Sequence, residues 1–206
     1  MERVTATVAD YLRAVEDGAD GLAAFYGQQL DRPCEAEREW VEREDALAVS
    51  ALSYARQGLR VFPLTPGRKT PLGDRDGCCG GTHGHGCLDA TLDLAFVAGW
   101  WRNHPTANVG IATGHRVDVI DQDGPAGARS WLAMPEWPAV LGVATTVRPE
   151  GGGVHRYVAA TGSGNGASLA PGIDYRGQGG YVLAPPSVVA GVRYAWVQPL
   201  KMGAVR

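Results

Sequence analysis

Apolar and polar positions divide the chain into stretches with helical spacing and short runs that suit strands. Apolar residues three or four positions apart predict helices over 8–18, 21–30, 35–57, 91–104 and 124–134. Short runs rich in Val, Ile and Tyr predict strands over 59–64, 108–114, 117–123, 143–149, 154–160, 172–176, 180–186 and 193–197. This order predicts a mixed α/β or α+β domain around one sheet, without a regular series of βαβ units.

The pattern also separates an acidic helical extension, residues 1–45, from a folded domain over residues 46–200. In the domain's first complete helix, over 91–104, Thr91 is the expected N-cap and Pro105 follows the end. Its apolar positions are Leu92, Phe96, Val97, Trp100 and Trp101. This spacing predicts that one face of the helix is buried.

Composition is that of an ordinary globular protein, with 45% apolar and 20% charged residues among 206. No apolar run approaches the roughly 20 residues that a membrane helix needs. The N-terminal stretch also lacks an apolar signal core. We therefore expect a cytoplasmic protein with no membrane partner.

Charge is distributed unevenly along the chain. Residues 1–50 carry twelve Asp or Glu and five Arg, whereas the remainder carries ten Asp or Glu and fourteen Lys or Arg. The net charge of −3 thus combines an acidic arm with a mildly basic body. Such a body permits a polyanionic partner without requiring one, and a solvated surface is the simpler interpretation.

Two carboxylates, Asp121 and Asp123, end the apolar run "VDVIDQDG". Residues i and i+2 of a strand share a face, so both side chains should point the same way. Adjacent carboxylates repel unless a cation compensates them, and hard oxygen ligands suit Mg²⁺ or Mn²⁺. A solvated turn and the Asp-x-Asp site of a nucleotide-sugar transferase are alternatives. A calcium loop is excluded, because Pro125 and Ala126 replace the required ligand and glycine.

Two later segments add further polar candidates. In "EGGGVHRYV", the glycines through Gly153 let the backbone approach an anion, and His155 can donate to a phosphate oxygen with Arg148 and Arg156 on either side. In "GIDYRGQGG", Asp174 and Arg176 share a strand face. A structural histidine and a surface Asp–Arg pair are the simpler interpretations.

The loop over residues 76–89, "DGCCGGTHGHGCLD", is dense in metal-binding side chains. Its candidate ligands are Cys78, Cys79, His83, His85 and Cys87. A tetrahedral zinc site needs four ligands, so four of these five predict structural Zn²⁺. A free-thiol loop, a redox pair at Cys78 and Cys79, and an ordinary polar turn are the alternatives.

In order along the chain, these segments resemble the bifunctional primase/polymerase (prim-pol) domains of the archaeo-eukaryotic primase superfamily, found in phage and plasmid replication proteins. The matching segments cover about Ala46 to Val197: "YARQGLRVFPLTPGRKTPL", "DATLDLAFVAGWW", "NVGIATG", "VDVIDQD", "GGGVHRY" and "GIDYRGQGGYVLAPPS". Two positions depart from the family's motifs. Gln122 replaces a usually apolar residue, and Gly153 stands where many relatives have serine.

The resemblance implies a sheet of the RNA-recognition-motif type joined to a second α/β unit, with the active site between them. It implies that Asp121, Asp123 and Asp174 bind two Mg²⁺ or Mn²⁺ ions and that His155 contacts the phosphates of the incoming nucleotide. Lys69 resembles a recurrent family lysine and would face template or nucleotide; a surface lysine is the alternative. Gly153 and Arg176 complete the expected nucleotide site.

The implied function is template-directed nucleotidyl transfer from (d)NTPs, for primer synthesis or extension on single-stranded DNA in a bacterial host cell. The resemblance also implies a helicase domain as a partner, in the same or another chain. The alternative is a non-catalytic, zinc-containing module that binds single-stranded nucleic acid. The His155 and Asp174 motifs, which follow Asp121 and Asp123 in the chain, argue against the nucleotide-sugar transferase.

Overall fold

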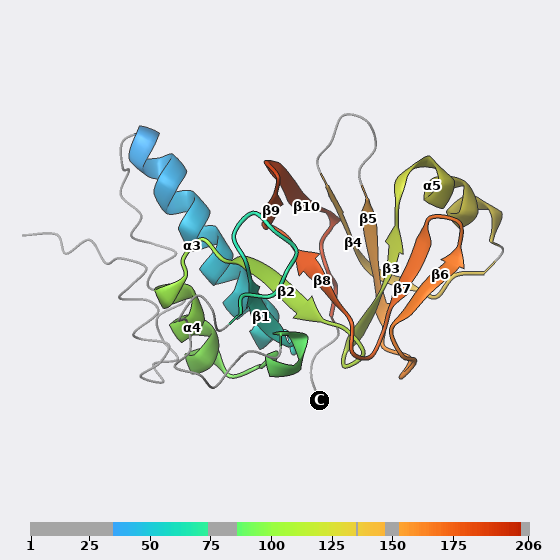
Figure 1. Ribbon diagram of the computed structural model, residues 1–206, viewed down its shortest axis with the longest axis horizontal. Helices are drawn as coiled ribbons and strands as arrows, with labels where there is room; N and C mark the ends of the chain where they lie inside the picture. The colour runs from blue at the N-terminus through green and yellow to red at the C-terminus, as the bar shows by residue number, and fades with distance from the viewer. Residues whose placement is uncertain (1–34, 74–85, 135, 147–152, 203–206) are drawn as a thin grey trace, which may run out of the picture.

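The computed structural model describes residues 35–73, 86–134, 136–146 and 153–202 (Figure 1). Its helices are α3 (Glu35–Arg56), α4 (Leu94–Asn103), α5 (Gly124–Ala133) and the 3₁₀ helix η2 (Gly86–Asp89). Its strands are β1 (Val61–Leu64), β2 (Asn108–Ala112), β3 (Val117–Gln122), β4 (Val140–Thr146), β5 (Val154–Ala159), β6 (Gly166–Ala170), β7 (Ile173–Arg176), β8 (Tyr181–Ala184), β9 (Val188–Val189) and β10 (Val192–Gln198). The helices expected over 8–18 and 21–30 lie outside the described residues.

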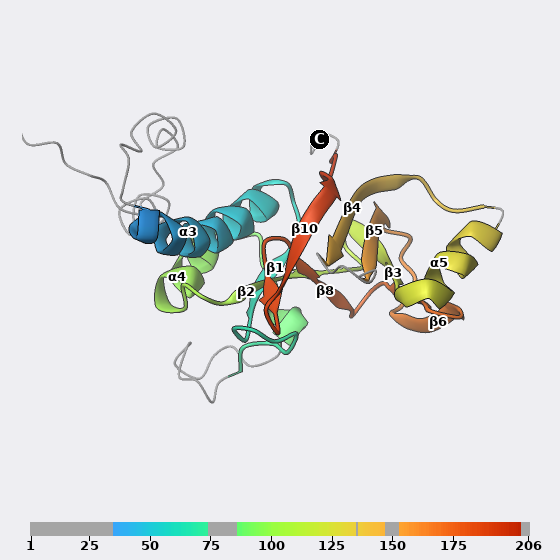
Figure 2. The same ribbon diagram turned by 90° about the horizontal axis from the view of Figure 1, so that it is seen from above.

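The strands form two sheets rather than the one expected from the pattern. A three-stranded sheet has the order β1-β2-β8, and a seven-stranded sheet has the order β6-β7-β3-β5-β4-β10-β9. Helices α3 and α4 pack at the end of the molecule that holds β1, whereas α5 packs at the opposite end against β3 and β7 (Figures 1 and 2). The α/β class is confirmed, and so is the two-part architecture that the family resemblance implies.

The larger sheet contains a split βαβ unit. Strand β3 leads through α5 to β4, and β5 pairs antiparallel with both strands, so β3 and β4 run in the same direction with β5 between them. A split βαβ unit is the building block of ferredoxin-like sheets. The adjacent strands of both sheets, within the ranges described, are all antiparallel.

The turn between β2 and β3 carries the chain from one sheet to the other. Gly114 in this turn has a φ of +86°, and a Cβ there would lie 2.1 Å from Gln178 Cα. Only glycine fits such a close approach. The hydrophobic pattern of a strand does not show which other strand it pairs with. The expectation of a single sheet was therefore wrong.

Alternation along β3 divides the core into two parts. Val117 and Val119 join the main hydrophobic core, which extends through the smaller sheet to α3 and α4. Ile120 faces the other way and packs with Val158 and Ile173 under α5. Asp121 shares the face of Val119, so it emerges at the edge of the space between the two sheets.

The start of α4 differs from the expectation. Asp93, not Thr91, is the N-cap: its Oδ1 accepts hydrogen bonds from the N–H groups of Ala95 and Phe96 at 2.9 and 3.2 Å. Thr91 instead exchanges backbone hydrogen bonds with Val61, which extends the strand pairing beyond β1. Leu92 therefore precedes the helix and is exposed. The α3 helix is confirmed and runs across the boundary placed between residues 45 and 46; the division into two regions stays a prediction.

No helix among the described residues is long and apolar enough to span a bilayer.

Candidate active site between the two sheets

Three side chains that are distant in the sequence meet in one row across the larger sheet. Asp121 on β3 lies directly opposite His155 on β5 and directly opposite Asp174 on β7. Side chains at directly opposed positions of antiparallel strands stand on the same face, with Cβ atoms about 5 Å apart. The register therefore brings together the three residues that the separate sequence motifs supplied.

Direct contacts tie this row together. His155 Nε2 lies 3.4 Å from Asp121 Oδ1. Arg176 Nη2 lies 3.2 Å from Asp121 Oδ2 and 2.9 Å from Asp174 Oδ2. Arg176 was expected to share a face with Asp174, and the structure confirms this. Because Arg176 also contacts Asp121, Asp174 and Arg176 are not a simple surface ion pair.

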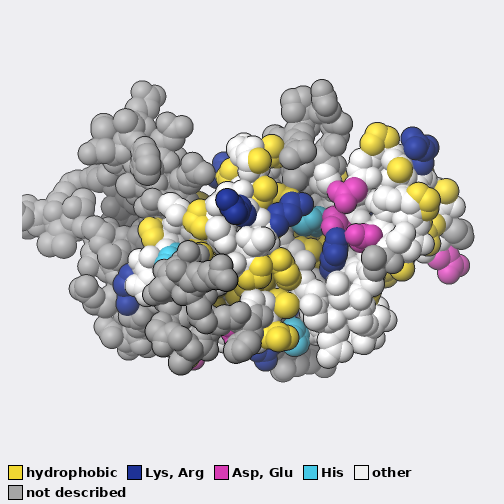
Figure 3. Space-filling model, viewed as in Figure 1, with side chains coloured by type: hydrophobic (Ala, Val, Ile, Leu, Met, Phe, Trp, Pro, Cys, Tyr) yellow, Lys and Arg dark blue, Asp and Glu magenta, His cyan; other side chains and the backbone are white. Residues whose placement is uncertain are grey.

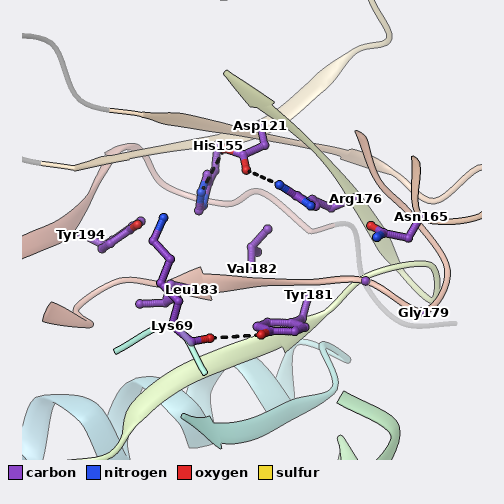
Figure 4. Close-up of a pocket in the computed structure, with 11 residues that line it drawn as sticks. Lys69, Asp121, His155, Asn165, Arg176, Gly179, Tyr181, Val182, Leu183 and Tyr194 are labelled. Carbon is purple, nitrogen blue, oxygen red and sulfur yellow. Dashed lines mark hydrogen bonds and ion pairs between the residues drawn. The ribbon is translucent and has the colours of Figure 1, made fainter. Parts of the chain in front are cut away.

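The row borders a cavity of about 260 Å³ between the sheets, and Asp121 and His155 belong to the cavity wall (Figure 4). Asp121, His155 and Arg176 line it from the larger sheet, together with Tyr194 on β10. The opposite wall comes from residues 179–183, at the start of β8, and from Lys69 in the loop after β1. Asn165 lies at the rim. The site thus lies between the two parts of the fold, as the resemblance implies.

Lys69 is held in place through its own backbone and that of its neighbour. Tyr181 Oη donates to the Lys69 carbonyl at 3.1 Å, and Asn108 Nδ2 donates to the Arg68 carbonyl at 3.1 Å. Asn108 is buried and also bonds the Val188 backbone on both its amide atoms. The Lys69 side chain extends into the cavity toward His155 and Tyr194 (Figure 4). This geometry favours the site interpretation of Lys69 over that of an ordinary surface lysine.

His155 is buried against Tyr194, with ring centroids 5.5 Å apart. Its Nδ1 makes no hydrogen bond within the described part of the chain. Burial lowers the pKa of His155 below its ordinary value; Asp121 opposes this shift and Lys69 adds to it. The imidazole is therefore neutral at pH 7, with one nitrogen able to donate and the other to accept.

We expect this buried histidine to make the fold sensitive to mild acid. The pKa of His155 is lower folded than unfolded, so the unfolded state binds more protons below about pH 6.5. The associated stability is present above that pH and is lost as the pH falls toward the folded-state pKa. Denaturant unfolding between pH 7.5 and 5 should show a flatter pH dependence for His155→Gln than for wild type. The same substitution at the exposed His115 is the control, and equal slopes in all three proteins would refute the expectation.

Asp123 and Gly153 lie beside the row rather than in the cavity wall. Asp123 follows β3 with extended backbone angles, φ −110° and ψ 124°, so the strand direction continues through it as expected. It is also the N-cap residue of α5, without a side-chain capping bond. A Cβ on Gly153 would lie 3.1 Å from Asp123 Oδ1, so a larger residue there would crowd this carboxylate. Gly153 and Asp123 are therefore neighbours, as their motifs suggest.

The described residues contain no group of three or more His, Cys, Asp or Glu side chains close enough to hold a metal ion. Arg176 joins Asp121 and Asp174 into a pair, and Asp123 follows Asp121 by two residues at the end of β3. The pair fits a divalent cation in its chemistry, because two carboxylates flank a guanidinium nitrogen that already serves as their cation. Two-metal binding by Asp121, Asp123 and Asp174 remains a prediction.

Arg156 does not belong to the site, although it was expected to flank His155 toward a phosphate. It lies on the opposite face of β5, where its Nη1 donates to Gln122 Oε1 at 2.6 Å and its guanidinium lies 3.9 Å from the Trp131 ring centroid. This hydrogen bond explains why Gln122, a polar residue, stands at a motif position that is usually apolar in the family. Gln122 is buried and serves as the hydrogen-bond partner of Arg156 beneath α5. Arg148 lies outside the described residues.

Sequence reasoning missed several residues that build the site. Tyr181, Tyr194 and Asn165 line the cavity, yet nothing in their spacing sets them apart from ordinary strand and loop residues. Asp118 was visible in the same run as Asp121 but falls on the opposite face of β3. It is fully buried and accepts hydrogen bonds from the Gly114 and Thr161 N–H groups at 3.0 and 2.7 Å. A charged residue inside a buried strand was the signal that could have found it.

Of the proposed zinc ligands, the structure describes only Cys87. Cys87 lies in η2, and its Sγ donates to the Gly179 carbonyl at 3.6 Å, next to the cavity. Burial raises the pKa of this thiol. Cys78, Cys79, His83 and His85 lie outside the described residues, so zinc binding by the loop stays a prediction.

The surface around the cavity carries both charge signs. In Figure 3, acidic side chains lie beside a histidine and basic side chains near the middle of the face, where the sheets meet. Of the residues that line the cavity, Asp121 is acidic, and Lys69 and Arg176 are basic. A ligand with phosphate groups would find cations on both walls.

Comparison with known families places most of the chain in a described family. Residues 51–204 match the family model described as "Bifunctional DNA primase/polymerase, N-terminal". The match covers well over half of the chain and includes every element from the end of α3 to β10. No curated protein matches the chain.

Proposed function

We propose, on the premise that the chain belongs to the bifunctional DNA primase/polymerase family, that it joins nucleotides on a single-stranded DNA template in the cavity between its two sheets. Membership implies primase/polymerase activity in general, and with it binding of DNA and nucleotides. The finer proposal is a nucleotidyltransferase that uses (d)NTPs for primer synthesis, primer extension or both.

The observation that carries this proposal is that Asp121 and His155 face Lys69 across the cavity, with Asp174 directly opposite Asp121 in the same row. The two carboxylates suit divalent cations, and the lysine on the other wall suits phosphate. A nucleoside triphosphate carries both kinds of partner, since its phosphates bind Mg²⁺ and accept from cationic donors. The arrangement therefore fits a nucleotide better than it fits a neutral ligand.

Mg²⁺ or Mn²⁺, when bound, would supply charge neutralisation at the phosphates and activation of the attacking hydroxyl. Asp121 and Asp174 are the residues that would hold it, with Asp123 next to them. Lys69 would bind the triphosphate from the opposite wall. His155, neutral and buried, would donate a hydrogen bond to a phosphate oxygen without adding a fixed charge. Tyr194 packs on the imidazole and keeps water from one side of it.

A primer-extension and primer-synthesis assay tests the proposal. Wild-type protein should incorporate labelled nucleotides on a single-stranded template with Mg²⁺ or Mn²⁺ and lose this activity in EDTA. The same assay with Asp121→Ala excludes a contaminating polymerase. Tight binding of single-stranded DNA without incorporation under either metal would refute catalysis and support the non-catalytic binding module instead.

The hydroxyl of Tyr181 should matter for nucleotide affinity. In Tyr181→Phe, the Lys69 carbonyl loses its donor, and the loop that carries the lysine is less constrained. We expect KM for the nucleotide to rise about threefold to tenfold with a smaller change in kcat, because a misplaced binding group weakens ground-state and transition-state contacts alike. Steady-state incorporation kinetics measure both values.

Tyr54→Phe is the matched control for this change. Tyr54 Oη donates to the Pro185 carbonyl at 2.6 Å outside the cavity, so its loss should lower stability without altering KM. An unchanged KM in Tyr181→Phe would show that the hydrogen bond does not position Lys69.

A further inference from the structure

Asp121 and Asp174 are like charges at directly opposed positions of neighbouring strands, an arrangement that is destabilising by itself. A cation on the same strand as Asp174 compensates the repulsion between the two carboxylates. Arg176 lies two residues beyond Asp174 on β7, so both side chains stand on the same face of the sheet. A single guanidinium nitrogen, Nη2, contacts both carboxylates.

The remaining carboxylate oxygens of this pair are also engaged. Asp121 Oδ1 faces His155 Nε2, and Asp174 Oδ1 accepts from the Ser168 N–H at 2.8 Å. The two Oδ2 atoms contact Arg176 alone among the contacts between described residues. These two oxygens are therefore the ones that can bridge a cation from both strands, and Arg176 already lies between them.

We propose that Arg176 is an internal counter-cation that competes with the catalytic metal for Asp121 and Asp174 and is displaced when the metal binds. This inference rests on the proposed metal-dependent function. A Mg²⁺ ion needs its oxygen ligands at about 2.0–2.1 Å, so between the two Oδ2 atoms it would take the position that the guanidinium nitrogen now holds, where the two like charges repel. The Arg176 side chain is 30% exposed and lines the cavity, which gives it room to move aside.

Direct Mn²⁺ binding, measured from the electron paramagnetic resonance signal of the free ion without nucleotide or DNA, tests the inference. Arg176→Gln removes the charge and keeps a polar but shorter side chain, and we expect it to bind Mn²⁺ about tenfold more tightly than wild type. Arg176→Lys keeps the charge and should bind as wild type does. Arg129→Gln, on the exposed side of α5, is the control for a change in net charge.

Thermal unfolding provides a second readout that needs no activity. Without metal, Arg176→Gln should unfold at a lower temperature than wild type, because the carboxylates lose their cation. At the same Mn²⁺ concentration its Tm should rise by more than that of wild type, since the tighter ligand shifts the equilibrium further.

Each outcome bears on a different conclusion. Equal Mn²⁺ affinity in wild type and Arg176→Gln would overturn the competition and leave the proposed function standing. Absence of Mn²⁺ binding by wild type and by both Arg176 variants at millimolar concentrations would overturn the competition together with the metal-dependent part of the proposed function. Tighter binding by Arg176→Gln and by Arg176→Lys equally would also overturn it, because charge would not be the cause.

Discussion

Asp121→Ala should lower nucleotide incorporation by at least about a thousandfold, the largest effect expected of any single substitution in this chain. Asp121 is the central residue of the row, with contacts to His155 on one side and Arg176 on the other. Its loss removes a proposed metal ligand, leaves the buried imidazole without its carboxylate and frees Arg176 to pair with Asp174 alone. The measurement is single-turnover primer extension with excess enzyme, so that slow residual chemistry is visible.

Two further variants separate charge from bulk. Asp121→Asn keeps the size of the side chain and one oxygen ligand but removes the negative charge, and we expect a loss close to that of the alanine variant. Glu136→Ala removes an exposed carboxylate outside the cavity and should act as wild type does. Activity within tenfold of wild type in both Asp121 variants would exclude a role for this carboxylate in the chemistry.

The row itself could be predicted because it depends on local rules and on order along the chain. Because side chains alternate along a strand, the sequence shows which residues share a strand face with Asp121 and with Asp174. The glycine run that precedes His155 marks the start of another strand. The carboxylates then indicate a cation as ligand, and the histidine indicates a phosphate group. What alternation does not provide is the pairing register, which the structure shows to be direct opposition on both sides of Asp121.

The second wall of the cavity could not be predicted in the same way. Lys69 reaches the site because Asn108 and Tyr181 hold the carbonyls of its loop, and these contacts join residues 40 and 112 positions apart. No periodicity carries such information, since both donors look like ordinary strand residues in the sequence. The division into two sheets was missed for the same reason, because partner choice is a property of the assembled fold.

Asp118→Ala should destabilise the domain by about 2–4 kcal/mol, the largest effect on stability that we expect. The Asp118 carboxylate is fully buried and accepts from the Gly114 N–H on one oxygen. Its other oxygen accepts from the N–H and hydroxyl of Thr161 and from the hydroxyl of Tyr175. Removal of the carboxylate leaves the Thr161 N–H and the Tyr175 hydroxyl without this acceptor, whereas the Gly114 N–H keeps its bond to the Val117 carbonyl at 3.0 Å.

This hydrogen-bond cluster also connects stability to the site. Tyr175 lies on β7 between Asp174 and Arg176, so its bond to Asp118 helps fix the strand that carries both residues beside Asp121. Burial raises the pKa of the Tyr175 hydroxyl, and its hydrogen bond to Asp118 adds to that rise, so the phenol stays a donor at neutral pH. Asp118→Ala should therefore reduce incorporation as well, even under conditions where the protein is folded.

Graded variants make this prediction specific. Tyr175→Phe removes one of the donors and should cost about 1 kcal/mol, clearly less than Asp118→Ala. Asp118→Asn keeps one acceptor oxygen but places an NH₂ group against donors on its other side, so it should fall between the two. Urea unfolding of each purified variant gives these values, with an unchanged m-value as the condition for comparing them. If Asp118→Ala lies within about 0.5 kcal/mol of wild type, the range usual for surface substitutions, water replaces the carboxylate without loss of stability.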